Sequence, residues 1–211
     1  MNILRYELLS EADLLSRLKK TRLRGYDRAE VYRDATLEIA NLDTDALTPA
    51  QRYVLVEGVQ TILDIADAFE PKGIDVFALR GALLFWPEGA DPAVDPAIPF
   101  LPPVIEESRE PGGRTVLLIN DGIHRVYAAR KRGRALNVVL AKGVPAEYPY
   151  YAYALADGWA AVEELAILTE GYQKKAYRNP DSYKALFRDF NEIFEGVQKQ
   201  RPRTNPAHLK A

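Results

Sequence analysis

The residue types that most directly suggest chemistry lie in one short turn. After the nearly all-apolar run at residues 115–119, and after Asn120, come Asp121, Gly122, Ile123, His124 and Arg125. From residue 123 the apolar side chains recur at helical spacing, so the turn opens a helix. The first N–H groups of a helix have no partner within it, and the dipole there favours negative charge. The turn therefore predicts an anion site, with phosphate as the expected ligand.

Each residue of this turn has its own expected role. Gly122 lets a ligand approach the backbone closely. Asp121 is a candidate helix cap, a candidate metal ligand and a candidate catalytic carboxylate. His124 and Arg125 are potential cations in the first helical turn, where positive charge opposes the helix dipole unless an anion neutralises it. The alternative interpretation is a capped helix whose histidine is hydrogen-bonded to a loop, with no ligand.

Two adjacent carboxylates, Glu106 and Glu107, are further candidates for a catalytic role. They follow the apolar start of a predicted strand, and adjacent strand residues face opposite sides, so only one of them can face the site. A carboxylate near a bound phosphate can act as a general base or hold Mg²⁺. The alternative is an exposed strand end. The proline-rich loop at 87–103 supplies other acids that could reach the site, which are Glu88, Asp91 and Asp95.

The turn is positioned by a strand, a helix and a second strand. Apolar runs at 115–119 and 136–141 flank the helix, which stops at Gly133. Short links between these elements predict a βαβ unit whose two strands form the central parallel pair of a small mixed sheet. Other predicted strands are at 74–79, 82–86 and from 104. Helices are predicted at 10–18, 27–40, 48–69, 157–169 and 181–194.

Aromatic side chains are concentrated between residues 148 and 159. In an extended segment Tyr151 and Tyr153 share one face, where such rings can stack on a nucleobase. The alternative is a hydrophobic seal with wet hydroxyl groups.

Composition excludes several kinds of site. The 211 residues contain no cysteine and two histidines, so disulfides, thiolate nucleophiles and multi-histidine metal sites are ruled out. Any metal is expected to be a hard ion such as Mg²⁺, held by carboxylates and phosphate. No apolar stretch approaches the roughly 18 residues of a membrane span, and no secretion signal is evident, so a cytoplasmic location is expected.

The net charge of −2 conceals an uneven distribution along the chain. Residues 172–211 carry nine Lys and Arg against four Asp and Glu, a net of +5, whereas residues 1–97 carry 11 against 17. Attraction of the whole protein to nucleic acid is therefore not expected. A local contact through the basic C-terminal part, including the tail from Gly196, stays open.

The turn resembles the DGxHR-type turn of the ParB/sulfiredoxin-like superfamily. Pro102-Pro103-Val104-Ile105 resembles the strand before it in that family, and residues 133–141 resemble the helix stop and next strand. The resemblance implies an α+β fold, a small mixed sheet with packed helices, here with N- and C-terminal helical additions. It also implies that Gly122, Ile123, His124 and Arg125 hold nucleotide phosphates. Sulfiredoxins carry a catalytic cysteine where this chain has Ile123, so thiol chemistry is excluded.

Three sequence regions are expected within what is essentially one compact domain. They are an N-terminal helical region at 1–73, a ParB/sulfiredoxin-like core at 74–156, and C-terminal helices with a basic tail at 157–211. The expected function is binding of a nucleotide (ATP, ADP or CTP) or of another small phosphorylated ligand, with Mg²⁺-dependent phosphoryl transfer or hydrolysis as the reaction. The alternatives are a DNA-associated, nuclease-like or DNA-binding protein, and a regulatory protein without catalysis.

Overall fold

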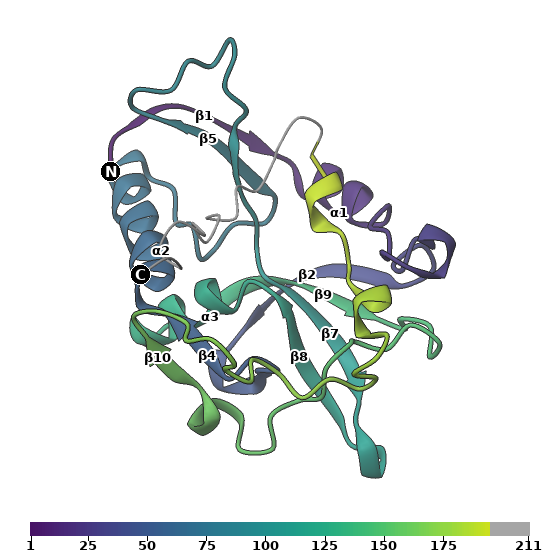
Figure 1. The fold of residues 1–211 in the computed structure, drawn as a ribbon. Coiled ribbons are helices and arrows are strands. Elements are labelled where there is room, and N and C mark those ends of the chain that lie inside the picture. Colours follow the sequence, from purple (N-terminus) through teal and green to yellow (C-terminus); the bar gives the residue numbers. More distant parts are fainter. Residues whose placement is uncertain (195–211) are drawn as a thin grey trace, which may run out of the picture.

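The computed structural model describes residues 1–194 of the chain, and Figure 1 shows their arrangement. The α-helices of this part are α1 (Glu11–Leu18), α2 (Val56–Phe69) and α3 (Ile123–Lys131). The strands are β1 (Ile3–Leu9), β2 (Thr36–Leu42), β3 (Leu47–Thr48), β4 (Tyr53–Leu55), β5 (Ala82–Pro87), β6 (Ile98–Phe100), β7 (Val104–Arg109), β8 (Thr115–Asp121), β9 (Leu136–Lys142) and β10 (Glu163–Leu165).

A five-stranded mixed sheet, in the order β2-β9-β7-β8-β3, forms the lower half of the molecule in Figure 1. A three-stranded antiparallel sheet, in the order β1-β5-β6, lies above it, and β10 pairs in parallel with β4. The helix α2 runs along one side of both sheets and contacts α3. The predicted α+β class, with a small mixed sheet and packed helices, is confirmed.

The predicted central parallel pair is wrong. Strand β7 lies between β8 and β9, antiparallel to β8 and parallel to β9, so β8 and β9 run in opposite directions. The turn at 111–113 folds β7 back along β8 as a hairpin, and β3 occupies the other edge of β8. Because both edges of β8 are taken, β9 pairs with β7 instead.

The N-terminal prediction holds for one helix and fails for another. Helix α1 begins as expected, because the Ser10 hydroxyl accepts a hydrogen bond from the Asp13 N–H at 3.1 Å. The helix predicted at 27–40 is wrong. The backbone at 26–28 has positive φ, and β2 pairs with β9 along its whole length. Pairing with an apolar strand here overrides the local signal for a helix.

The long helix predicted from Thr48 begins only at Val56. The residues before it pair with sheet edges instead, since β3 extends the main sheet beside β8 and β4 pairs with β10. Its end is as predicted, because Gly73 adopts a left-handed conformation at φ 72° after the 3₁₀ turn at 70–72. Residues 74–79 form turns and no strand.

Both predicted C-terminal helices are wrong. The segment from 157 contains a 3₁₀ turn at 158–161 and the short strand β10, and the segment from 181 contains only 3₁₀ turns at 183–186 and 190–192. The buried side chains of Leu186, Arg188, Ile193 and Phe194 hold this segment in an irregular path against the body. In Figure 1 this segment, drawn in yellow, lies beside β7 and runs up towards α1. The tail from Gly196 lies outside the described residues.

Two apolar clusters hold the layers together. The larger one joins α2 and α3 to the sheets and includes Val59, Phe69, Phe85, Ile105, Val126 and Val138. The other joins α1 to the opposite face of the main sheet and includes Leu14, Leu18, Tyr32, Val104, Val139 and Phe194. Adjacent residues of β7 and β9 enter different clusters, so the centre of the main sheet is buried on both faces. The end of β8, where the candidate site begins, therefore rests on a rigid base.

Candidate functional site

The turn between β8 and α3 is built around Gly122. This residue is the N-cap of α3 at φ 93°, and no side chain caps the helix there. The positive φ favours glycine, and the missing Cβ also leaves room for the guanidinium group of Arg125, whose Nε would lie 2.7 Å from a Cβ here. Asp121 therefore does not fill the cap position predicted for it. The first-turn N–H groups of α3 lack intrahelical partners and point out of the turn, as an anion site requires.

Arg125 folds back over this turn. Its guanidinium group donates hydrogen bonds to the Asp121 carboxylate and to the backbone carbonyl of Leu101, and its side chain is only 12% exposed. The ring of Phe100 lies 6.0 Å from the guanidinium carbon. The positive charge of Arg125 is thus balanced by the carboxylate of Asp121, and both groups lie at the N-terminus of α3.

His124 connects the two helices that meet at the site. Its Nε2 accepts a hydrogen bond from the backbone N–H of Leu55 at 3.0 Å, directly before α2. Its ring packs on α2 so closely that a Cβ at Gly58 would lie 2.8 Å from the ring. Burial, and next the charge of Arg125, lower the pKa of His124, so the ring is neutral at pH 7. A hydrogen-bonded histidine is one part of the alternative interpretation of this turn, and the structure shows such a hydrogen bond.

A cavity of about 580 Å³ opens beside the turn and is lined by all five of its residues, 121–125. One wall is the face of α2, with Gly58, Thr61, Ile62 and Ile65, and another is the segment at 98–101. The volume falls in the range of sites for small ligands and cofactors, about 300–1,000 Å³. Polar groups are gathered at the α3 end and apolar groups along α2, so the cavity offers a charged end and an apolar wall.

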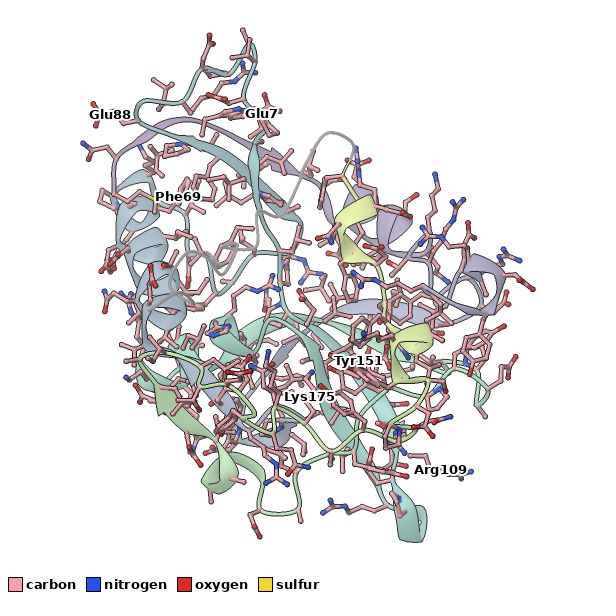
Figure 2. The ribbon with its side chains drawn as sticks, viewed as in Figure 1. Glu7, Phe69, Glu88, Arg109, Tyr151 and Lys175 are labelled. Atoms are coloured by element: carbon pink, nitrogen blue, oxygen red, sulfur yellow. The ribbon has the colours of Figure 1, made fainter. Side chains whose placement is uncertain are left out.

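Two further residues line this cavity: Tyr151, which the sequence offers as a candidate for stacking on a nucleobase, and Lys175, which the sequence does not single out. Figure 2 labels both, close together where the C-terminal segments cross the sheet. The Lys175 amine donates hydrogen bonds to the hydroxyls of Tyr150 at 2.6 Å and Tyr151 at 2.7 Å. The aromatic run at 148–153 was a usable signal for the tyrosines. No local pattern marks Lys175, because its partners are 24 and 25 residues away.

A second cavity, of about 510 Å³, lies on the other side of this group. It is lined by aromatic and basic side chains of the C-terminal segments, including Tyr177, Tyr183 and Phe187. Both cavities share the side chains of Gln51, Asn120, Asp121, Tyr151 and Lys175. Lys175 and Asp121 therefore face two adjoining spaces.

Within the described part of the chain, neither Glu106 nor Glu107 of β7 lines either of these two cavities. Glu106 is buried and forms a two-point ion pair with Arg188, with both N–O distances 3.0 Å. The Tyr32 hydroxyl also donates to it at 2.6 Å. Glu107 points to the opposite face and is exposed. Of the three carboxylates predicted to be catalytic, the structure brings only Asp121 to the turn.

The acids of the proline-rich loop lie elsewhere. Figure 2 places Glu88 at the far end of the molecule from Tyr151 and Lys175, where Asn2 donates a hydrogen bond to it at 2.7 Å. Asp95 accepts a hydrogen bond from the Asp91 N–H within the same loop. Within residues 1–194 no three His, Asp or Glu side chains gather closely enough to hold a metal ion.

The basic side chains in and after α3 are each paired with a carboxylate. The pairs are Arg130 with Asp45, Lys131 with Glu164, Arg132 with Asp67, and Arg134 with Asp75. Their charge is compensated within the fold, which leaves less unpaired positive charge on this surface for contacts with phosphates. No helix in the described part of the chain is long and apolar enough to cross a membrane.

Comparison with known proteins gives one match. The model of the family described as ParB CE domain matches residues 13–163, more than half of the chain. The match includes the turn, α2 and α3, and it ends before Lys175 and Arg188. A comparison with curated proteins finds no match.

Proposed function

The chain belongs to the ParB CE domain family, and from this premise we propose that the cavity beside the turn at 121–125 binds a nucleotide through its phosphates. The observation that carries the proposal is the uncapped N-terminus of α3, which opens into a cavity of about 580 Å³. Donor N–H groups and the positive end of the helix dipole favour an anion there.

The two ends of the cavity suit the two parts of a nucleotide. The phosphates lie at the turn, where Gly122 allows close approach and Arg125 supplies a cation. Arg125 would add a phosphate oxygen to its partners Asp121 and Leu101, since a guanidinium group carries five N–H donors. The base and sugar lie along the apolar wall, where Tyr53 provides an aromatic face.

For the reaction, the cavity offers Asp121 as the candidate base for phosphoryl transfer or hydrolysis. The described part of the chain has no cluster of carboxylates that forms a metal site by itself. Mg²⁺ would therefore enter on the phosphate oxygens of the nucleotide, as this ion commonly does. Arg125 would balance the charge that develops on the transferred group.

The first experiment is a binding panel. Thermal shift and calorimetry with ATP, ADP, CTP, GTP and inorganic phosphate, with and without Mg²⁺, identify the ligand. At least one nucleotide should bind and raise the melting temperature. If none binds at millimolar concentration, the proposed function is wrong.

A pair of variants then locates the site. Arg125→Met should weaken binding by more than tenfold, because a hydrogen bond to a charged group contributes about 1.5–3 kcal/mol. Arg130→Met, in the same helix, is the matched control, since Arg130 pairs with Asp45 and does not line the cavity. Equal losses in both variants would place the nucleotide elsewhere. Melting temperatures of the empty variants show whether either fold is weakened.

A further inference from the structure

The amine of Lys175 lies in unusual surroundings at the boundary between the two cavities. Its hydrogen-bond partners are the hydroxyls of Tyr150 and Tyr151, and the two rings lie 5.0 and 4.6 Å from it. The residue as a whole is half-buried, and its amine lies against these two rings. An ammonium group enclosed in this way has lost most of its hydration, which favours the neutral form.

The nearest titratable groups on the tyrosine side carry no charge. Burial raises the pKa of Tyr150 well above its usual value and that of Tyr151 to about 12, so both remain phenols at pH 7. Burial also raises the pKa of Tyr177, whose ring stacks on that of Tyr151. His124, across the first cavity, is neutral because its pKa is lowered. None of these groups can balance an ammonium charge.

The charged groups around Lys175 are already engaged. The carboxylate of Asp121 favours the ammonium form of Lys175, but it also binds Arg125, so one negative charge faces two cations. The other pairs around the second cavity are Arg188 with Glu106, and Asp189 with Arg24 and Arg28. Burial accordingly outweighs Asp121 and lowers the pKa of Lys175 to about 7.

We propose that Lys175 is a further phosphate-binding residue, which takes up a proton from solvent when the nucleotide enters the cavity. The inference rests on the proposed function and adds to it a residue outside the family match. The negative charge of Asp121 is already shared with Arg125, so Lys175 lacks a counter-charge of its own. A bound phosphate supplies that counter-charge. The neutral amine gains one proton and becomes an ammonium group, which donates hydrogen bonds to a phosphate oxygen and to the tyrosines.

The sign of the pH dependence follows from this exchange. Below about pH 7 the amine of the empty protein is already protonated, so affinity is independent of its titration. Above pH 7 the empty protein loses this proton while the complex keeps it, so affinity falls, by up to tenfold per pH unit. The ligand's own phosphates are fully ionised above about pH 7.5, since their last pKa is about 6.

Calorimetry at pH 8 tests the uptake on the unmodified protein. The probe is the nucleoside triphosphate that binds most tightly in the panel, titrated in buffers of different ionisation enthalpy. Binding should take up close to one proton. Lys184→Met, which alters an exposed lysine that lines neither cavity, should behave like the unmodified protein. Lys175→Met should take up almost none, and it should bind more than tenfold more weakly at pH 6.5 but with a smaller deficit at pH 9.

Two outcomes would overturn the inference and leave the proposed function standing. One is tight binding without proton uptake, and the other is an uptake unchanged in Lys175→Met. His124 is the other side chain in the cavity that could take up the proton. In His124→Gln the proton uptake should persist, because it is assigned to Lys175. If Lys175→Met fails to fold, Lys175→Arg replaces it, and its permanent charge should abolish the uptake. Failure of every nucleotide to bind at any pH would instead overturn the proposed function and this inference with it.

Discussion

At the scale of single residues, Glu106 and Glu107 show how neighbours in a strand acquire different environments. The side chain of Glu106 is 3% exposed and that of its partner Arg188 is 0% exposed, so both charges depend on each other. Removing one member of a buried pair leaves the other charge without compensation, which typically costs about 3–5 kcal/mol. Glu107 is exposed on the opposite face.

The substitution Glu106→Gln should therefore destabilise the fold by several kcal/mol, because Arg188 loses its counter-charge. Glu107→Gln is the matched control and should change the free energy of unfolding by less than about 0.5 kcal/mol, as is usual for surface sites. Urea denaturation followed by circular dichroism measures both. A small effect at Glu106 together with lost nucleotide turnover would indicate that this residue is catalytic after all.

His124 should give the fold a dependence on pH. Its folded-state pKa lies below the unfolded value of about 6.5, so the unfolded chain binds a proton at a pH where the folded protein does not. Stability from this residue is present above about pH 6.5 and is lost as the pH falls below it. Between pH 7.5 and 5.5 the unmodified protein should lose more stability than His124→Gln, whose amide oxygen can still accept from Leu55. Equal losses in denaturation experiments would contradict this role.

At the scale of elements, the contact between α2 and α3 depends on a glycine inside a helix. Gly58 lies in the first turn of α2, and the His124 ring occupies the space that a Cβ would take. A glycine in a helix normally costs about 0.5–1 kcal/mol relative to alanine. Here the absence of a side chain at Gly58 allows α3, and with it the turn at 121–125, to approach α2 closely.

The effect of Gly58→Ala on the free energy of unfolding should have opposite signs in the unmodified protein and in the His124→Ala variant. In the unmodified protein it should destabilise by about 1–3 kcal/mol, because the ring of His124 is displaced. In His124→Ala it should stabilise by about 0.5–1 kcal/mol, the usual effect of alanine in a helix. A double-mutant cycle of unfolding free energies measures this coupling. Additive effects would show that the ring and the helix do not press on each other.

At the scale of the whole molecule, the distribution of charge limits how nucleic acid can bind. Residues 1–195 carry 24 Lys and Arg against 30 Asp and Glu, and the basic side chains in and after α3 are paired. The positive excess is in residues 196–211, with four basic and no acidic residues, which lie outside the described part of the chain. Any attraction to DNA is therefore expected to come from this tail.

A chain ending at Glu195 should fold like the complete chain and show no affinity for duplex DNA at physiological salt. If the complete chain binds DNA, the logarithm of its affinity should fall linearly with the logarithm of the salt concentration. The slope should correspond to no more than about four phosphate contacts, since the tail has four basic residues. Circular dichroism checks the fold, and fluorescence anisotropy at several salt concentrations measures binding. Salt-sensitive DNA binding by the shortened chain would show that the folded body provides the contact. A shortened chain that aggregates or melts far lower would show that the tail is a packed element.

The sequence by itself determined the features that depend on local signals. The turn at 121–125, the helix after it and the helix that starts after residue 10 follow from short-range turn and capping chemistry, and the structure contains them all. The apolar and aromatic side chains at 181–194 recur at helical spacing, but the segment contains only 3₁₀ turns. Periodicity records which side chains are buried, and an irregular segment held by Arg188 buries them equally well.

Only the tertiary structure decided which distant groups meet. It placed β7 between β8 and β9, paired Glu106 with Arg188, and bound His124 to the backbone before α2. It also brought Lys175 to the turn, although nothing adjacent in sequence distinguishes it from Lys174. The physical reason is that charge, burial and hydrogen bonding are set by neighbours in space, and these partners are separated by tens of residues along the chain.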